Sequence, residues 1–219
     1  MTDVDIERKA EYPLGEEIAN SVAHGVGVAL SLAALIVLTV YGSRADTAAA
    51  LAAGIVFGLA LVLEYTASTL YHALPQPGAK HVFKIIDHAG IYLLIAGSYT
   101  PFTLLALGSP LGWWVFAFIW AMAVAGICVE AFWAYRPRWV SVVIYLAMGW
   151  AVIFTIQPLV ASLTGAELWL LVAGGVCYTV GTPFYIFKKI PYFHFVWHLW
   201  VIAGSACHVL AAISLIARS

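Results

Sequence analysis

The sequence predicts an all-α integral membrane protein with seven transmembrane helices. Of its 219 residues, 63% are hydrophobic and only 10% are charged, whereas about a quarter of the residues in an ordinary soluble domain are charged. The chain therefore has too few charges to cover a surface that faces water. Apolar stretches of about 20 residues, the length that crosses the hydrocarbon core of a bilayer as a helix, recur along the chain.

Seven such stretches give the expected helices, and short polar segments connect them. Residues 1–17, MTDVDIERKAEYPLGEE, form the expected N-terminal tail, and residues 18–219 form a single seven-helix domain. We expect no cleavable signal peptide, because this tail is polar and acidic and lacks a basic patch followed by an apolar run. The expected helices comprise residues 18–41, 47–72, 83–107, 111–133, 139–163, 166–187 and 195–217.

The distribution of lysine and arginine predicts the orientation of these helices. Eight of the ten basic residues fall on one side of the membrane, and only Arg44 and Arg218 fall on the other. Because positively charged connections stay in the cytoplasm, the N-terminus is expected in the cytoplasm and the C-terminus outside. The eight residues expected in the cytoplasm are Arg8, Lys9, Lys80, Lys84, Arg136, Arg138, Lys188 and Lys189.

Charge and cysteine content argue against two other classes of protein. The net charge of −1 provides no basic surface for nucleic acid. The three cysteines, Cys128, Cys177 and Cys207, are an odd number and lie in apolar stretches. They are expected to be small buried side chains and not a disulfide framework.

The segment from Pro191 to His208, PYFHFVWHLWVIAGSACH, carries three of the seven histidines. His194 and His198 are four residues apart, so on a helix both imidazoles lie on one face, one turn apart. This arrangement suits the binding of a metal ion. His208 lies about 15 Å farther along the helix axis, which is too far to share the same ion.

Other polar residues gather on the cytoplasmic side in the predicted topology. Asp87 and His88 open the third helix, and Glu130 lies near the cytoplasmic end of the fourth. Ionisable groups at membrane depth are costly and usually face a cavity or one another. Two further helices carry a polar stripe along one face. The stripes are Glu17, Asn20 and His24, at i, i+3 and i+7, and Glu64, Ser68 and His72, at i, i+4 and i+8.

These residues lead to the hypothesis of a zinc site formed by three histidines. Neutral imidazoles from His72, His194 and His198 suit Zn2+ with a water as the fourth ligand. Such a water supplies hydroxide near neutral pH, and Asp87 could act as its general base. Ser68, one turn before His72, could orient a ligand or a substrate carbonyl.

The alternative is a polar helix seam in which the histidines only form hydrogen bonds. His88 follows Asp87 directly and therefore points about 100° away from it on a helix, which favours a supporting or packing role. The sequence leaves open the roles of Glu17, Asn20, His24, Glu64, His88 and His208.

Four motifs give the chain a resemblance to a known family. They are EIANSVAH (17–24), STLYH (68–72), IDHAGIYLLIAGSYTPF (86–102) and HFVWH (194–198). In this order they resemble the signature segments of the hemolysin III family, the bacterial branch of the progestin and adipoQ receptor (PAQR) superfamily that includes the adiponectin receptors. The resemblance implies a multi-pass protein of the bacterial plasma membrane, with seven helices and the N-terminus inside.

The resemblance also implies functional residues and a substrate class. In the characterised receptors, three histidines hold zinc near the cytoplasmic side, and by motif they match His72, His194 and His198. An aspartate that matches Asp87 contacts the zinc-bound water, and a serine that matches Ser68 lies nearby. These receptors are similar to alkaline ceramidases, which hydrolyse a lipid amide, so a membrane lipid or fatty-acyl substrate is expected.

Several functions remain open at this stage. The first is a ceramidase-like, zinc-dependent hydrolase of a membrane lipid amide or ester. The second is a non-enzymatic sensor or regulator of membrane lipid homeostasis with structural zinc. The family name suggests a cytolysin, but a secreted toxin needs a soluble state that this composition does not provide. A channel or transporter is disfavoured, because helices four to six lack a matching polar path outward.

Overall fold

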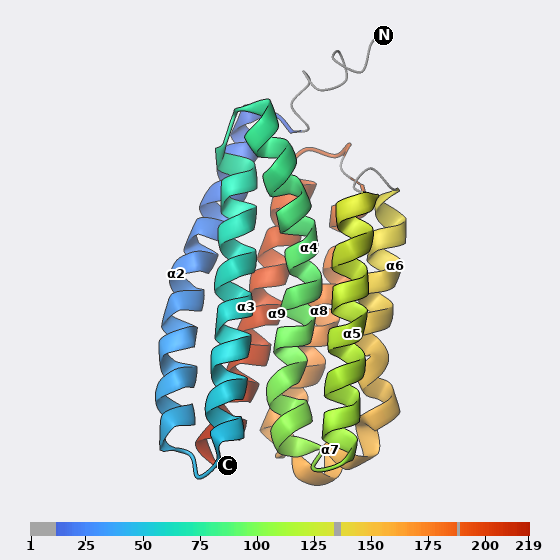
Figure 1. Cartoon of the computed structure of the whole chain (residues 1–219). Helices are drawn as coiled ribbons and strands as arrows, with labels where there is room; N and C mark the ends of the chain where they lie inside the picture. Colours follow the sequence, from blue (N-terminus) through green and yellow to red (C-terminus); the bar gives the residue numbers. More distant parts are fainter. Residues whose placement is uncertain (1–11, 134–136, 188) are drawn as a thin grey trace.

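A computed structural model describes residues 12–133, 137–187 and 189–219, and these residues form helices and connections without strands (Figure 1). Seven helices are long and apolar enough to cross a membrane. The predicted all-α class with seven membrane-spanning helices is therefore confirmed.

The helices follow one another in an up-and-down bundle (Figure 1). The first three spans are α2 (Leu14–Arg44), α3 (Ala48–Ala73) and α4 (Pro77–Pro101), which continues into a π-helical turn, η1 (Phe102–Ala106). The fourth is α5 (Leu111–Phe132). The fifth consists of α6 (Arg138–Gly149), a 3-10 segment, η2 (Trp150–Thr155), and α7 (Ile156–Ser162). The last two are α8 (Gly165–Ile186) and α9 (Phe193–Ala217).

Two helices begin four or more residues before the apolar stretches indicate. α2 begins at Leu14 and not at residue 18, and its first turn contains Glu16 and Glu17. Acidic side chains are favoured there by the positive end of the helix dipole. α4 begins at Pro77 and not at residue 83. Proline is tolerated in the first turn, because its missing N–H would have no partner within the helix.

The fifth span changes its hydrogen-bonding pattern between α6 and α7, and Tyr99 of α4 stabilises this break. The Tyr99 hydroxyl donates to the carbonyl oxygens of Gly149, at 2.7 Å, and of Met148, at 3.1 Å. It also accepts a hydrogen bond of 2.8 Å from the backbone N–H of Val152. Backbone groups that leave the α-helical pattern inside a bilayer must find partners within the protein, and Tyr99 provides them.

Small residues allow α2 and α3 to pack closely. Gly54 of α3 lies against Leu38 of α2, and Gly58 lies against Leu35, so a Cβ at either glycine would collide with α2. Close approach through small residues is typical of helix pairs in membranes, where apolar surface alone provides little driving force between helices. α3 also packs against α4, and α9 packs against both α2 and α8.

The outward face of the bundle is apolar. Phe132 is 90% exposed, Phe154 89% and Trp114 74%. An apolar surface of this kind is a liability in water but suits contact with lipid. Polar side chains, by contrast, are buried at the end of the bundle where α2, α4 and α9 begin and α3 ends (Figure 1). They are Glu16, Glu17, Asn20, His24, Ser68, His72, Asp87, His88, Glu130, His194 and His198.

A smaller polar contact joins α8 and α9 at the opposite end of the bundle. Glu167 forms a capping box with Thr164 at the start of α8. Both of its carboxylate oxygens accept hydrogen bonds of 2.9 Å from Arg218, which directly follows α9. A bidentate contact of this kind fixes two helix ends relative to each other.

The charge asymmetry predicts a topology that fusion proteins can test. α2 begins and α9 ends at opposite ends of the bundle (Figure 1), so the two termini lie on opposite sides of the membrane. We expect a C-terminal alkaline phosphatase fusion to be active and a C-terminal green fluorescent protein fusion to be dark, because the charge asymmetry predicts a C-terminus outside. Fusions in the connection after Ala73 should behave in the opposite way. A fluorescent C-terminal fusion with inactive phosphatase would contradict this orientation.

The break in the fifth span predicts a stability effect of Tyr99→Phe. Loss of the hydroxyl leaves buried backbone groups near Gly149 without their partner, which should lower the free energy of unfolding by about 1–3 kcal/mol. The measurement is reversible unfolding in mixed detergent micelles. Tyr41→Phe, at a side chain that is 41% exposed on α2, serves as control. Equal stabilities of the two variants would show that Tyr99 does not support the break.

Candidate metal centre

Three histidines from two helices meet at the polar end of the bundle. His72 lies in the last turn of α3, and His194 and His198 lie in the first turns of α9. The backbone of Tyr192, with a φ of 62°, turns the chain immediately before α9 begins. All three imidazoles are buried, and one ring nitrogen from each lies within 4.8 Å of those of the other two. These three histidines could therefore form a metal site.

The spacing of the ring nitrogens fits a tetrahedral ion. The Nε2 atoms of His194 and His198 are 3.2 Å apart. Two nitrogen ligands at about 2.0–2.1 Å from a tetrahedral metal are separated by about 3.3 Å. The ring centre of His72 lies 5.2 Å from that of His194 and 5.0 Å from that of His198. The third imidazole is thus close enough to complete the set.

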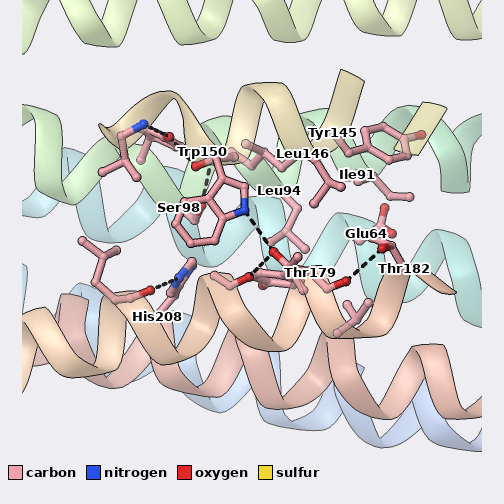
Figure 2. Close-up of a pocket in the computed structure, with 18 of the residues that line it drawn as sticks. Glu64, Ile91, Leu94, Ser98, Tyr145, Leu146, Trp150, Thr179, Thr182 and His208 are labelled. Atoms are coloured by element: carbon pink, nitrogen blue, oxygen red, sulfur yellow. Dashed lines mark hydrogen bonds between the residues drawn. The ribbon is translucent and has the colours of Figure 1, made fainter. Parts of the chain in front are cut away.

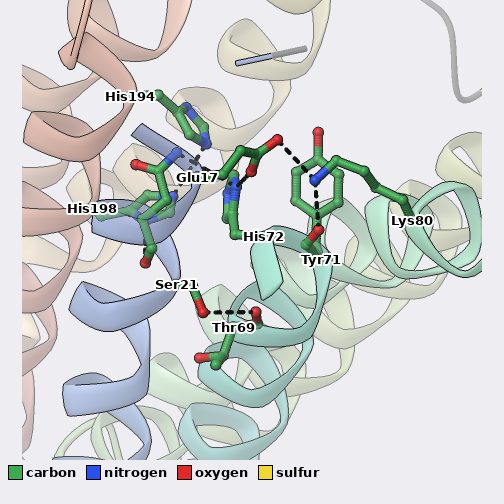
Figure 3. Close-up of polar contacts among 9 residues, drawn as sticks. Glu17, Ser21, Thr69, Tyr71, His72, Lys80, His194 and His198 are labelled. Carbon is green, nitrogen blue, oxygen red and sulfur yellow. Dashed lines mark hydrogen bonds and ion pairs between the residues drawn. The ribbon is translucent and has the colours of Figure 1, made fainter. Parts of the chain in front are cut away.

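Contacts at Nδ1 orient two of the imidazoles. Nδ1 of His72 lies 2.7 Å from Oε2 of Glu17 (Figure 3). Nδ1 of His198 lies 3.4 Å from the backbone oxygen of Asn20. A ring that donates from Nδ1 to an oxygen carries its lone pair on Nε2, which is the form that binds a metal. Both oxygen partners belong to α2, so the first span orients ligands from the second and seventh.

Glu17 is in turn held by Lys80, as Figure 3 shows. The Lys80 ammonium lies 2.8 Å from Oε1 of Glu17 and donates a 3.0 Å hydrogen bond to the backbone oxygen of Tyr71. It also lies 4.8 Å above the centre of the Tyr71 ring. Lys80 therefore connects the start of α4 to the carboxylate that orients His72.

Aromatic contacts pack against the histidines on two sides. The ring of His24 stacks on that of His198 with a centroid separation of 3.7 Å. Both nitrogens of His24 are buried, with no hydrogen-bond partner among the described residues. Tyr12 stacks on His194 at 4.7 Å. These rings limit rotation of the two imidazoles of α9.

Asp87 and Ser68 share a cavity with two of the three histidines. Ser68 is one turn before His72 on α3, and Asp87 lies in α4; both are buried and line the same cavity as His194 and His198. Asp87 lies within electrostatic range of the Ser68 hydroxyl and of His88. A carboxylate and a hydroxyl therefore share the space next to the candidate metal ligands.

Two other histidines have partners elsewhere. Nδ1 of His88 lies 3.1 Å from Oε1 of Glu130 on α5, which fits the supporting role expected for it. His208 donates from Nε2 to the backbone oxygen of Leu171 over 3.2 Å. His208 is also ten residues beyond His198 on α9, about 15 Å along the helix.

An elongated cavity that His194 and His198 line extends into the bundle, and Figure 2 shows part of its wall. Its wall follows α4 from Asp87 to the start of η1 at Phe102 and beyond, a distance of about 22 Å at 1.5 Å per residue. This exceeds half of a hydrocarbon core of about 30 Å, the depth that one acyl chain fills. Aliphatic and aromatic side chains dominate the wall. Examples are Ile91, Leu94, Phe102, Leu146, Ile153 and Leu159.

Glu17, Lys80 and Tyr12 support the histidines in ways that the sequence does not specify. The spacing of Glu17 on one face with Asn20 and His24 indicates a polar stripe but not its partner. Lys80 indicates only the cytoplasmic side, and Tyr12 lies in a polar tail without any recognisable pattern.

The comparisons with known proteins agree with the motifs. The family model described as Haemolysin-III related matches residues 12–209. The chain belongs to the hemolysin III family. It is 46% identical over 191 residues to Hemolysin-3 of Bacillus cereus, and the aligned region covers 87% of each chain. It is 43% identical over 195 residues to the Hemolysin-3 homolog of Bacillus subtilis (strain 168), covering 89% of this chain and 92% of the relative.

A more distant similarity extends the hemolysin III relationship to animals. The chain is 31% identical over 173 residues to the human monocyte to macrophage differentiation factor, covering 75% of this chain and 70% of the relative. The predicted family is thus confirmed. As a hemolysin III protein with seven apolar helices, the chain is a multi-pass integral membrane protein, consistent with a bacterial plasma membrane.

The Glu17–His72 contact predicts an effect on metal affinity. Glu17→Ala removes the acceptor for Nδ1 of His72, so the imidazole loses its orientation and part of its basicity. Removal of such a supporting group weakens metal binding by about 10–100-fold. The measurement is competition with a chromogenic chelator on purified protein. Lys80→Met, which leaves the Glu17 carboxylate in place, should have a smaller effect.

A matched control for Glu17→Ala is Ser31→Ala on the same helix. Ser31 is also buried, but its hydroxyl donates only to the backbone oxygen of Val28 over 2.9 Å. Metal affinity should therefore stay at the wild-type value. If Glu17→Ala binds metal as tightly as Ser31→Ala, the carboxylate does not support the site.

Proposed function

We propose that this protein is a zinc-dependent hydrolase of a membrane lipid amide or ester, with its metal site near the cytoplasmic face. The observation that carries the proposal is a cluster of three histidines, two of which, His194 and His198, line a long apolar cavity together with Asp87 and Ser68. A polar group that can be hydrolysed would reach the histidines while an acyl chain fills the apolar part.

The donor set supports zinc. Three neutral imidazoles, His72, His194 and His198, with one open position are a typical set for catalytic zinc. Zinc bound there would polarise a carbonyl group and lower the pKa of a bound water to about 7. The Nδ1 contacts to Glu17 and to the Asn20 backbone oxygen favour the ring tautomers that such binding requires.

Asp87 and Ser68 have defined tasks in this proposal. Hydrolysis adds water to the carbonyl carbon and breaks its C–N or C–O bond. Asp87 accepts one proton of the attacking water and returns it to the leaving nitrogen or oxygen. Ser68 lies within electrostatic range of Asp87 and orients either this carboxylate or the substrate carbonyl. The apolar wall around Leu94 and Phe102 holds the acyl chain and limits the access of bulk water.

A non-enzymatic sensor or regulator with structural metal would use the same histidines but would not need Asp87 to transfer a proton.

A lytic activity, which the name of the Bacillus cereus relative suggests, is not supported as a direct function. A toxin that reaches other cells needs a water-soluble state, and side chains such as Phe132 and Phe154 give the bundle an apolar outer surface.

Metal content and hydrolysis test the proposal together. We expect about one zinc ion per chain in detergent-purified protein, and loss of this zinc in the double variant His194→Ala/His198→Ala. Mass spectrometry measures the metal content. A panel of lipid amides and esters in mixed micelles, followed by release of fatty acid, measures hydrolysis.

Asp87→Asn separates catalysis from structure. Removal of a general base lowers the rate by about 10²–10⁴-fold, while zinc content and unfolding temperature should stay close to the wild type. Asp46→Asn, in the short connection between α2 and α3, is the matched control and should retain full activity. A wild-type protein that holds zinc but leaves the whole panel intact would refute the hydrolase and favour structural zinc.

A further inference from the structure

A second polar cluster lies deeper in the cavity than the metal centre, and hydrolysis as proposed does not use it. It consists of Glu64 and Tyr65 on α3, Tyr178 on α8 and Ser205 on α9. Glu64 and Tyr178 line the cavity. The cluster therefore places polar groups in a wall that is otherwise mainly aliphatic and aromatic.

Three members of this cluster satisfy one another. The Tyr65 hydroxyl donates to Oγ of Ser205 over 2.9 Å, and the Tyr178 hydroxyl lies 2.8 Å from the same oxygen. A serine hydroxyl can donate one hydrogen bond and accept two, so Ser205 connects both tyrosines. This contact also joins α3, α8 and α9 at mid-depth in the membrane.

Glu64 differs from the other members. Its side chain is buried, and Oε2 has no hydrogen-bond partner among the described residues. Glu64 lies against Gly90 of α4, where a Cβ would collide with Oε2. The absence of a side chain at Gly90 thus provides the space that the carboxyl group fills. A buried carboxyl oxygen without a partner is costly at membrane depth.

The position of Glu64 restricts the ligand that could supply the missing partner. Figure 2 shows Glu64 in the cavity wall near Ile91 and Leu94, with His208 toward the other end of the region drawn. Glu64 is eight residues before His72 on α3, which is about 12 Å along the helix axis. A molecule that reaches from the metal centre to Glu64 must therefore be long and apolar, with one polar group partway along it.

From this geometry we propose that the cavity binds an acyl chain that carries a hydroxyl group near its middle, and that Glu64 holds this hydroxyl. An extended carbon chain advances about 1.3 Å per carbon, given C–C bonds of about 1.5 Å. The hydroxyl is therefore expected at about the ninth or tenth carbon from the carbonyl group. A carboxyl group pairs well with a hydroxyl, which can both donate and accept. This inference rests on the proposed function, because it takes the carbonyl group to lie at the metal centre.

Binding of matched fatty acids tests the proposal. The probes are stearic acid, 10-hydroxystearic acid and 3-hydroxystearic acid, and each displaces a fluorescent polyene fatty acid from the full-length protein in lipid nanodiscs. After correction for partition into lipid, 10-hydroxystearic acid should bind about tenfold more tightly than stearic acid, the effect of one added hydrogen bond. 3-Hydroxystearic acid should show no such gain, because its hydroxyl lies far from Glu64.

Two variants of Glu64 and one control identify the residue responsible. Glu64→Leu should bind stearic acid as the wild type does but lose the preference for the 10-hydroxy acid. Glu64→Gln keeps groups that donate and accept, so it should retain part of the preference. Leu63→Ala, at a side chain that is 55% exposed on the outer face of α3, should leave it unchanged. A wild type without the preference, or a Glu64→Leu variant that keeps it, would overturn the proposal.

Two further arms separate this proposal from the proposed hydrolysis. The preference of the wild type for the 10-hydroxy chain is measured apart from hydrolysis, because displacement of the fluorescent fatty acid requires no bond to break. A preference that persists while no lipid is hydrolysed would leave the subsite standing without the enzyme. The same displacement measurement with the N-ethyl amides of these acids identifies the form of the ligand. Tighter binding of the amide indicates a site for intact lipid amides, and tighter binding of the acid indicates a site for released fatty acids.

Discussion

The contact between Glu17 and His72 is the interaction on which the polar end of this bundle depends. It joins the first and second spans at 2.7 Å, and Lys80 extends it to the start of α4. A carboxylate, an ammonium and three imidazoles in an apolar bundle would each be costly alone. Because each group faces a partner, the end of the bundle can hold a dense polar cluster without opening to lipid.

The same arrangement explains why the reactive groups and the cavity are joined. Most of the buried ionisable side chains lie at one end of the bundle, whereas aliphatic and aromatic side chains make up most of the cavity wall. The irregular segments η1 and η2 also border this cavity. Backbone that departs from the α-helical pattern is tolerated in a membrane protein where it faces other protein groups or a cavity, as Tyr99 shows beside η2.

The sequence predicts the number of spans and the proximity of the histidines, but not how they are supported. Apolar length defines the helices, and HxxxH spacing together with helix order brings His72 near His194 and His198. Glu17 is recognisable as part of a stripe, but the identity of its partner depends on how α2 rotates against α3. Gly54 and Gly58 help to set that rotation through close packing; their GxxxG spacing indicates a face for close contact but does not identify the partner helix. The cavity is equally hidden, because its apolar wall residues look in the sequence like any residues that face lipid.

The candidate ligands come from the second and the last spans, and this has a consequence for the synthesis of the protein. A chain that emerges from the ribosome presents His72 long before His194 and His198, and a single imidazole holds a metal ion weakly. An ion held by all three histidines could therefore be acquired only after α9 has entered the membrane and packed against α2 and α3. Metal occupancy would then report that insertion is complete, and chains stalled before the seventh span would remain empty and open to degradation.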